Sequence, residues 1–375
     1  MACLLRKGRN LGLTEKQRED LRHIRGVVQD SRYRIFHECN LRQVTVGFKL
    51  RSGKITSDLG IVAFTQAKLS RNQLNDRRIL PLEDSVKGVL TDVVEVPGGF
   101  YPRSERKVRL PEDSLSETLT KPTTLPAGFG RSANFGRQRP FKGGDAGIHF
   151  AVSGSGTFAI VNKDSEILTN NHVGANEDVE GGDFARQGDV WLQPGAHGGA
   201  TASDAVAVLD RWNKIAPAVL HQDYRFNMYD AAIGRVLDNL EEGTDFEPGQ
   251  VRKLGNVEGA TSVDVGDEVT KMGARTEVTK GIVTHVFVPG AVTRVGPYHG
   301  HDADFALQLV IQSQQGPFSG AGDSGSLILR DEKDKGAGSY KAAALLFAGG
   351  TDEHGSDLTI ASPIIPIIHN LKFKL

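Results

Sequence analysis

The chain has 375 residues, with 45 Lys and Arg against 46 Asp and Glu, a formal net charge of −1 and 38% hydrophobic residues. That length predicts two domains, and the apolar content is enough for their packed cores. A charge balance so close to neutral gives no electrostatic signal for nucleic acid or a membrane surface, and no run of about 18 apolar residues predicts a membrane span. We therefore expect a globular protein with neither partner.

The N-terminal elements predict a small α+β module. A helix is expected over 14–29, because Thr14 followed by Gln17 is an N-cap signal. The β-rich runs 44–50 and 59–64 flank a Ser-Gly turn and predict a hairpin. A helical or irregular stretch then leads to another strand candidate at 91–96.

Composition divides the chain into three regions. Residues 1–97 form the predicted module, for which a packing or assembly role and a regulatory role both stay open. Residues 98–142 are rich in Pro, Gly, Ser, Thr and Arg, which predicts a surface linker. Residues 143–375 contain many short apolar runs separated by turns, and 363–371 could form a short C-terminal helix. This pattern predicts an all-β barrel or sandwich, so the expected fold is mainly β.

The segment Gly320-Ala321-Gly322-Asp323-Ser324-Gly325-Ser326 precedes an apolar run. A serine between glycines can expose its hydroxyl while backbone N–H groups of the turn converge beside it. Ser324 is therefore a candidate nucleophile, with the N–H groups of Gly322 and Ser324 as its oxyanion hole. A turn that merely closes a hairpin is the alternative if no base and orienter exist.

Both partners can be found upstream. His172 ends a short apolar strand, where its ring can face a cleft, and Asp230 stands directly before an apolar segment that could bury its carboxylate. The order His172, Asp230, Ser324 differs from the Ser, Asp, His order of α/β-hydrolases, whose Gly-x-Ser-x-Gly motif is also broken here by Ser326. It differs as well from the Asp, His, Ser order of subtilisins, and it is the order of the chymotrypsin-like double β-barrel.

From about Gly143 onward the chain resembles the trypsin-like serine peptidases of the chymotrypsin fold. More narrowly, it resembles a bacterial and plant group that includes the rice NARROW LEAF protein. The matching segments are Gly156-Thr157, Asn170-Asn171-His172-Val173, Trp191-Leu192-Gln193-Pro194-Gly195, Asp230-Ala231-Ala232-Ile233, Lys271-Met272-Gly273, Gly322-Asp323-Ser324-Gly325-Ser326 and Leu346-Phe347-Ala348-Gly349-Gly350. The resemblance implies two β-barrels with the active site between them, preceded by the α+β module.

The resemblance also implies a specificity pocket. Its walls would be the segment from Phe318 to Ala321 and the strand that contains Ala348, Gly349 and Gly350. Phe318 falls where a trypsin carries the acidic residue at the base of the pocket. We therefore expect a small or apolar residue before the cleaved bond.

These residues predict a serine endopeptidase that works through an acyl-enzyme. Ser324 would attack the peptide carbonyl, His172 would take up its proton, and Asp230 would orient the imidazole. Latency until a partner triggers the enzyme is a variant of this hypothesis. The alternative is a pseudoprotease or scaffold that binds peptides without cutting them. The expected partner is a protein or peptide substrate, while a regulatory protein and homo-oligomers stay open.

The remaining signals concern compartment and cofactors. The two cysteines, Cys3 and Cys39, lie outside the predicted protease domain. The apolar run near the N-terminus is too short for the hydrophobic core of a signal peptide. We therefore expect a cytoplasmic protein. His299 and His301 have the chemistry of metal ligands, but a Gly-rich loop more often leaves such histidines solvated. Neither a Walker loop nor a dinucleotide fingerprint is present, so no metal or cofactor is expected.

Overall fold

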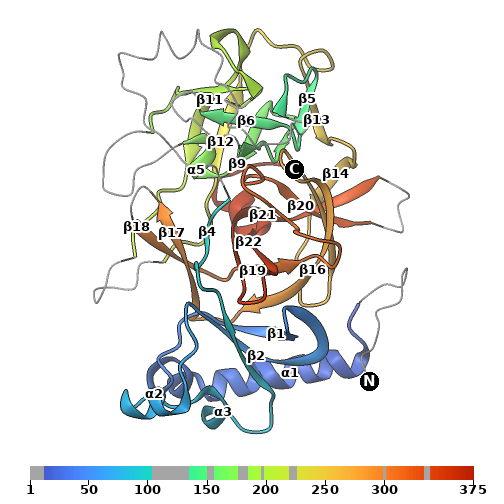
Figure 1. The fold of residues 1–375 in the computed structure, drawn as a ribbon. Coiled ribbons are helices and arrows are strands. Elements are labelled where there is room, and N and C mark those ends of the chain that lie inside the picture. Colours follow the sequence, from blue (N-terminus) through green and yellow to red (C-terminus); the bar gives the residue numbers. More distant parts are fainter. Residues whose placement is uncertain are drawn as a thin grey trace.

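The computed structural model describes residues 12–103, 135–149, 156–175, 185–195, 198–218, 226–298, 301–332 and 338–375 (Figure 1). Its helical elements are α1 (Glu15–Asp30), a π-helical turn η1 (Arg34–Glu38), α2 (Arg71–Asp76), α3 (Leu82–Ser85), α5 (Asn171–Gly174), a 3-10 turn η5 (Ala202–Asp204) and α6 (Ile364–Asn370). Its strands are β1 (Val44–Arg51), β2 (Lys54–Thr65), β3 (Thr91–Glu95), β4 (Tyr101–Pro102), β5 (Phe141–Gly143), β6 (Ala146–His149), β7 (Gly156–Thr157), β8 (Ile160–Val161), β9 (Glu166–Thr169), β10 (Val190–Leu192), β11 (Ala205–Trp212), β12 (Ala232–Val236), β13 (Phe246–Val251), β14 (Gly255–Ala260), β15 (Glu268–Gly273), β16 (Glu277–Phe287), β17 (Val292–Tyr298), β18 (His301–Ala306), β19 (Leu309–Gln312), β20 (Leu327–Asp331), β21 (Ser339–Thr351) and β22 (Asp357–Pro363).

The C-terminal half contains a closed ring of strands. In the order β15, β16, β19, β22, β21, β20 each strand pairs antiparallel with the next, and β20 pairs back with β15. Closure leaves this ring without free edges. Its interior is filled by buried apolar side chains that include Val283, Ile311, Phe318, Ile328 and Leu346.

The preceding segment forms a second, half-closed barrel. Its seven strands lie in the order β7-β6-β10-β11-β12-β9-β8. Trp191 is fully buried at its centre and stacks on Phe158 with ring centroids 5.7 Å apart. A separate core cluster joins this half to the closed ring and to α6, with members such as Leu168, Tyr229, Leu327 and Ile364. The prediction of a mainly β, double-barrel fold preceded by a small α+β module is confirmed.

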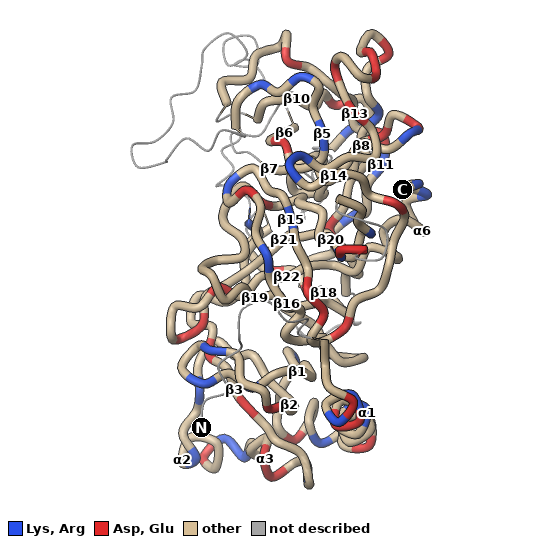
Figure 2. Tube along the Cα trace, turned by 90° about the vertical axis from the view of Figure 1, so that its right-hand side faces the viewer, with Lys and Arg blue, Asp and Glu red and all other residues tan. Residues whose placement is uncertain are grey.

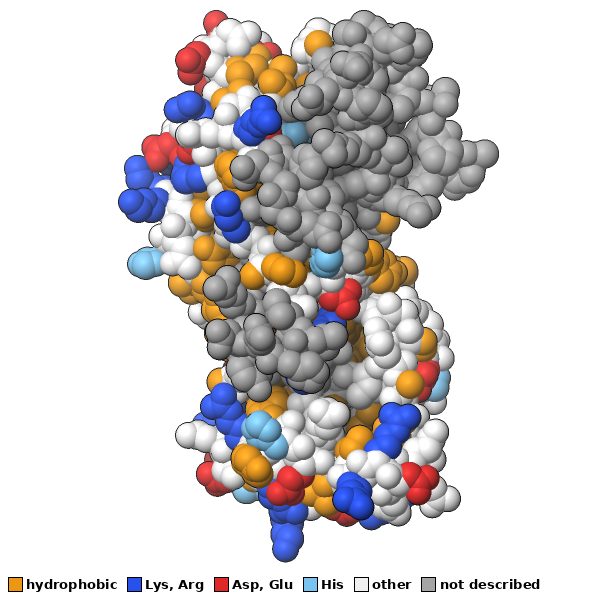
Figure 3. All heavy atoms as spheres, turned by 90° about the vertical axis from the view of Figure 1, so that its left-hand side faces the viewer, with side chains coloured by type: hydrophobic (Ala, Val, Ile, Leu, Met, Phe, Trp, Pro, Cys, Tyr) orange, Lys and Arg blue, Asp and Glu red, His pale blue; other side chains and the backbone are white. Residues whose placement is uncertain are grey.

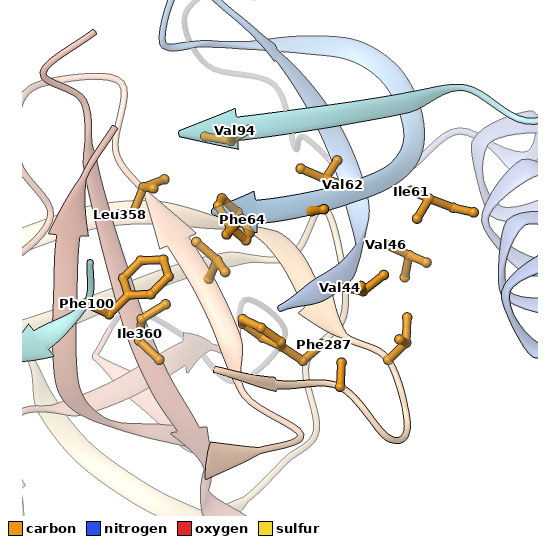
Figure 4. Close-up of a cluster of buried hydrophobic side chains, with 14 of the residues drawn as sticks. Val44, Val46, Ile61, Val62, Phe64, Val94, Phe100, Phe287, Leu358 and Ile360 are labelled. Atoms are coloured by element: carbon orange, nitrogen blue, oxygen red, sulfur yellow. The ribbon is translucent and has the colours of Figure 1, made fainter. Parts of the chain in front are cut away.

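The N-terminal module continues the sheet of the closed ring. Strand β1 pairs antiparallel with β16, and β2 and β3 extend the sheet beyond β1. Figure 4 shows the shared core, in which Val46, Phe64 and Val94 of the module belong to the same cluster as Phe287 and Ile360 of the ring. A single apolar cluster therefore spans residues predicted to belong to different domains.

Local sequence explains why the module folds as it does. Thr14 caps α1 by accepting a hydrogen bond from the Gln17 amide, and Gln17 Oε1 accepts one from the Thr14 amide, so the predicted N-cap is confirmed as a capping box. The predicted hairpin is also confirmed, and its turn has Ser52 and Gly53 at φ 48° and 70°. Positive φ at both positions matches the right-handed twist of the two strands.

His285 lies at the seam between the module and the ring. It is fully buried opposite Gly47 of β1, its ring centroid is 5.2 Å from that of Phe64, and Nδ1 lies 2.9 Å from Thr284 Oγ1. Burial lowers the pKa of His285 from 6.5 to about 3. The folded protein therefore keeps this imidazole neutral at pH values where the unfolded chain would protonate it.

A pH dependence of stability follows. Between pH 6.5 and about 3 the unfolded state binds more protons at His285, so the free energy of unfolding falls as the pH falls, by up to about 4 kcal/mol. In urea unfolding measured across this window, the free energy of unfolding should fall more steeply with decreasing pH in wild type than in His285→Gln. The exposed His23→Gln serves as control and should follow wild type; equal slopes for His285→Gln and wild type would contradict the assignment.

Charge is distributed without a dominant sign. Lys and Arg alternate with Asp and Glu along the described trace, including α1 (Figure 2). On the face seen in Figure 3, basic, acidic and hydrophobic side chains are intermixed over the coloured part of the surface. None of the helices in the described ranges combines the length and apolar composition needed to span a bilayer.

The predicted linker is only partly visible. Most of residues 98–142 fall outside the described ranges, but Tyr101–Pro102 forms β4 and Phe141–Gly143 forms β5. Figure 1 shows β4 running from the N-terminal module toward β21 of the closed ring. The boundaries at 97 and 142 stay a prediction, and the path of β4 bears directly on the site.

Candidate active site

The half-closed barrel holds His172 at the end of one of its strands. The chain leaves β9 at Thr169 and turns into the short helix α5, which contains His172. The Trp191 indole donates a hydrogen bond of 2.6 Å to the Gly174 carbonyl, and a Cβ at Gly174 would overlap the Trp191 ring. The buried core of this barrel therefore fixes the helix that carries His172.

Asp230 holds the histidine ring. Its Oδ2 contacts His172 Nδ1 and accepts a 2.9 Å hydrogen bond from the Tyr298 hydroxyl, while Oδ1 accepts from the His172 amide at 3.2 Å. Burial alone would raise the pKa of the completely buried Asp230, but His172 and the hydrogen bonds from His172 and Tyr298 hold it below its ordinary value. Burial and Asp230 together raise the pKa of Tyr298 well above 10. The pair is therefore an ionised carboxylate beside an oriented imidazole.

The Ser324 turn is anchored by its neighbour Asp323. The Asp323 carboxylate accepts hydrogen bonds from the amides of Arg275, Thr276 and Gly320 at 2.9, 3.1 and 2.9 Å. Lys271 Nζ, also fully buried, lies 3.4 Å from Asp323 Oδ2. With the Thr276 hydroxyl, which donates to Oδ2 at 2.6 Å, five donors hold this side chain, so Asp323 acts as a structural anchor of the turn.

The Ser324 turn lies against the end of β9. The Thr157 amide donates to the Ser324 carbonyl at 2.7 Å, and Thr169 Oγ1 donates to the Thr157 carbonyl at 2.8 Å. The Ser324 hydroxyl, however, donates to the Phe347 carbonyl at 3.1 Å. Within the described residues, His172 Nε2 is buried without a hydrogen-bond partner. The structure therefore joins His172 to Asp230 and leaves the Ser324 hydroxyl turned toward β21.

Strand β4 occupies the strand edge beside this serine. Tyr101 and Pro102 pair antiparallel with Gly349 and Ala348. The Arg103 amide donates to the Phe347 carbonyl at 3.0 Å, so the pairing extends by one residue beyond β4. The Gly322 amide, which the sequence predicts as an oxyanion-hole donor, donates to the Arg103 carbonyl at 2.6 Å. The backbone of 101–103 thus lies along β21 with its last carbonyl at the predicted oxyanion hole.

A buried carboxylate receives the Arg103 side chain. Arg103 Nη2 pairs with Asp357 Oδ1, and the two side chains are only 8% and 10% exposed. The other oxygen, Oδ2, accepts from the Phe318 amide at 3.1 Å, the Ser319 amide at 3.3 Å and Thr359 Oγ1 at 2.9 Å. Burial raises the pKa of Asp357 while the Arg103 guanidinium opposes that rise. Three donors thus fix the carboxylate with one oxygen pointing at the guanidinium.

The surroundings of Phe318 differ from those assumed when a small or apolar residue is expected before the cleaved bond. That expectation rested on Phe318, whose side chain is fully buried in the core of the closed ring. Its backbone amide, by contrast, supports Asp357. The acidic group comes from Asp357, the first residue of β22. The group that faces the Arg103 side chain is therefore a carboxylate.

The other predicted pocket residues have different surroundings. Ala348 and Gly349 pair with β4, the Gly350 carbonyl lies 3.4 Å from Arg103 Nη2, and Ala321 is half-buried beside Gly322. A Cβ at Gly349 would overlap the Arg103 guanidinium, so glycine is needed there to leave room for the side chain.

Three polar residues of the site, Asp357, Tyr298 and Arg103, were not predicted from the sequence. Asp357 begins a strand in which the apolar residues Leu358 and Ile360 alternate with Thr359, and this sequence pattern could have placed Asp357 on the face of Thr359. Tyr298 and Arg103 carry no local signal, because long-range strand pairing places them. Among the described residues no group of three or more His, Cys, Asp and Glu could hold a metal ion, and His299 of the considered metal motif lies outside the described ranges.

Comparison with solved structures finds proteases of low sequence identity. Cellulomonas bogoriensis chymotrypsin is 18% identical over 62% of this chain and 95% of its own, with a TM-score of 0.37. A glutamic acid-specific serine protease described as using a histidine triad in substrate binding is 18% identical over 62% and 98%, with a TM-score of 0.39. Thermobifida fusca Protease A is 15% identical over 62% and 95%, with a TM-score of 0.38. Identities this low say nothing about substrate choice.

Comparison by sequence gives no further relatives. No family model matches the chain, and no curated protein matches it.

Proposed function

We propose that this protein is a serine endopeptidase that forms an acyl-enzyme on Ser324. The observation that carries the proposal is the buried His172–Asp230 pair, whose carboxylate also accepts a hydrogen bond from Tyr298. The pair lies at the end of strand β9, and hydrogen bonds from Thr169 to Thr157 and from Thr157 to Ser324 connect this strand end to the Ser324 turn. An ionised carboxylate that fixes Nδ1 leaves Nε2 as the proton acceptor that a serine nucleophile requires.

The proposed chemistry assigns one task to each group. Rotation about the Ser324 Cα–Cβ bond would move the hydroxyl from the Phe347 carbonyl toward His172 Nε2, which would accept its proton during attack on the peptide carbonyl. The N–H groups of Gly322 and Ser324 would bind the oxyanion, and Asp230 would stabilise the imidazolium. His172 would then protonate the leaving amine. Hydrogen bonds at such sites often tighten only with substrate, so the present hydroxyl orientation is compatible with these roles.

A peptide-binding scaffold without cleavage is the second candidate. The observation that favours it is the Ser324 hydroxyl, which donates to Phe347 and not to His172. Both candidates bind an extended peptide along β21, so only a chemical test separates them.

Labelling with a fluorophosphonate probe makes that separation. A serine peptidase should form one adduct at Ser324, located by peptide mapping, and Ser324→Ala should form none. Because residues 101–103 lie in the site, wild type and Arg103→Gln should both be labelled, the variant faster. Ser326→Ala provides a control serine in the same turn. Folded protein that stays unlabelled in both wild type and Arg103→Gln would favour the scaffold.

The narrower group, the compartment and the partners are parts of the same proposal. Cys39, the cysteine that the structure describes, is a buried free thiol, which is typical of a protein in a reducing compartment. We propose that the enzyme belongs to the bacterial and plant group that the sequence resembles. We propose a cytoplasmic enzyme whose partner is a protein or peptide substrate, with regulation through its N-terminal region. Fractionation of the native host tests the location, and recovery in an oxidising extracellular fraction would contradict it.

A further inference from the structure

We propose that residues 100–103 are an internal substrate and that the enzyme cleaves its own chain after Arg103. The proposal rests on the proposed serine-peptidase function and adds a substrate, a specificity and a processing site to it. It is carried by four independent contacts of one short segment, which together match the geometry of a bound peptide substrate.

The first two contacts are made by the backbone. Antiparallel pairing of Tyr101 and Pro102 with β21, continued by the hydrogen bond from the Arg103 amide to Phe347, aligns the segment in one register. The Arg103 carbonyl then meets the Gly322 amide at 2.6 Å. An ordinary packing segment would need no oxyanion-hole donor on its carbonyl, whereas the carbonyl before a cleaved bond does.

The third contact is the ion pair in the pocket. Burying a guanidinium and a carboxylate together is tolerated only when each is well paired. Asp357 meets this condition because backbone amides and Thr359 hold one oxygen while the other faces Arg103. This arrangement predicts cleavage after arginine.

The fourth contact anchors the segment upstream. Phe100 is 3% exposed in the shared core, 5.8 Å from Phe64 between ring centroids, and its carbonyl accepts from the Gly296 amide at 3.0 Å. Figure 4 shows the Phe100 ring beside Ile360 of β22. A segment held in this way reaches the site of its own chain at a high effective concentration, so the reaction is intramolecular.

The proposed step balances as a hydrolysis. The Ser324 oxygen bonds to the Arg103 carbonyl carbon, the bond from that carbon to the nitrogen of residue 104 breaks, and the Ser324 proton passes through His172 to the leaving amine. Water then releases the Arg103 carboxylate and restores Ser324. Fragments 1–103 and 104–375 would stay together, because β1 pairs with β16 and the core of Figure 4 spans both.

The test is intact mass under denaturing conditions on purified full-length protein, followed over time. Wild type should yield the two masses of 1–103 and 104–375, with a new N-terminus at residue 104, while its elution under native conditions stays that of one particle. Ser324→Ala should stay a single chain. Arg103→Gln should slow cleavage at this bond at least tenfold, whereas the exposed Arg22→Gln should match wild type. The half-time should not change on tenfold dilution.

Several outcomes would overturn the proposal. If wild type remained a single chain while the fluorophosphonate probe still labelled Ser324, self-cleavage would be excluded and the peptidase function would still be supported. If Ser324→Ala gave the two fragments in the same yield as wild type, a host protease would be the cause, and the self-cleavage proposal would be overturned as well. Absence of both labelling and cleavage, in wild type and in Arg103→Gln, would contradict the peptidase function itself.

Discussion

Replacing Asp230 by asparagine is expected to lower kcat for peptide hydrolysis by roughly 10⁴-fold, the size of effect known for the orienting aspartate of a Ser-His-Asp triad. The two carboxylate oxygens of Asp230 accept hydrogen bonds from the His172 amide, from His172 Nδ1 and from the Tyr298 hydroxyl. An amide in this position can present its NH₂ group to Nδ1, which favours the wrong tautomer and supplies no charge for the imidazolium. KM should change little, because Asp230 contacts the imidazole and not the peptide strand.

The measurement is steady-state hydrolysis of an arginyl peptide, made in the Arg103→Gln background so that the segment does not compete. Asp238→Asn, an exposed carboxylate after β12, is the matched control and should retain full activity. Loss of less than about tenfold in Asp230→Asn, with the fold intact by circular dichroism, would remove Asp230 from the proposed triad.

Replacing Asp357 by asparagine is expected to abolish the preference for arginine. Truncating one partner of a buried, hydrogen-bonded charge pair costs about 2 to 5 kcal/mol, which corresponds to a loss of about 30- to 5,000-fold in kcat/KM for an arginyl substrate. The same peptide with citrulline, which keeps the shape and lacks the charge, should lose little. Arg103→Gln with Asp357→Asn removes both buried charges, so this double variant should fold normally.

The comparison is therefore between Arg103→Gln and the double variant on the two peptides. Asp331→Asn, at the exposed end of β20, controls for the loss of a surface carboxylate. An unchanged ratio of arginyl to citrullyl hydrolysis in the double variant would show that Asp357 does not set specificity.

The site was predictable from sequence where its chemistry is local. His172 and Ser324 lie at strand ends next to glycine or helix-starting residues, and such positions carry recognisable motifs. Asp357 was missed because it is an isolated acidic residue beside a loop, and Phe318 was given a pocket role that its buried ring does not have. Arg103 could not be predicted at all, since only the pairing of β4 with β21 brings it to the Ser324 turn.

The fold shows the same division between local and distant causes. Capping at Thr14, the hairpin at Gly53 and the short strands of the barrels follow from patterns within a few residues. Strands β13 and β14 were not predicted, because Pro248, Gly249 and Gly259 weaken any strand signal. The pairing of β1 with β16 joins residues more than 200 positions apart, and no local pattern encodes it.

The most direct test of the account is a burst titration with an arginine-like ester, 4-nitrophenyl 4-guanidinobenzoate. A Ser324 nucleophile served by a cation-binding pocket predicts a rapid release of nitrophenol approaching one equivalent per chain in Arg103→Gln, and none after Ser324→Ala. The burst should slow strongly when Asp357→Asn is added. Folded Arg103→Gln protein without a burst, or a burst that survives Ser324→Ala, would contradict the account.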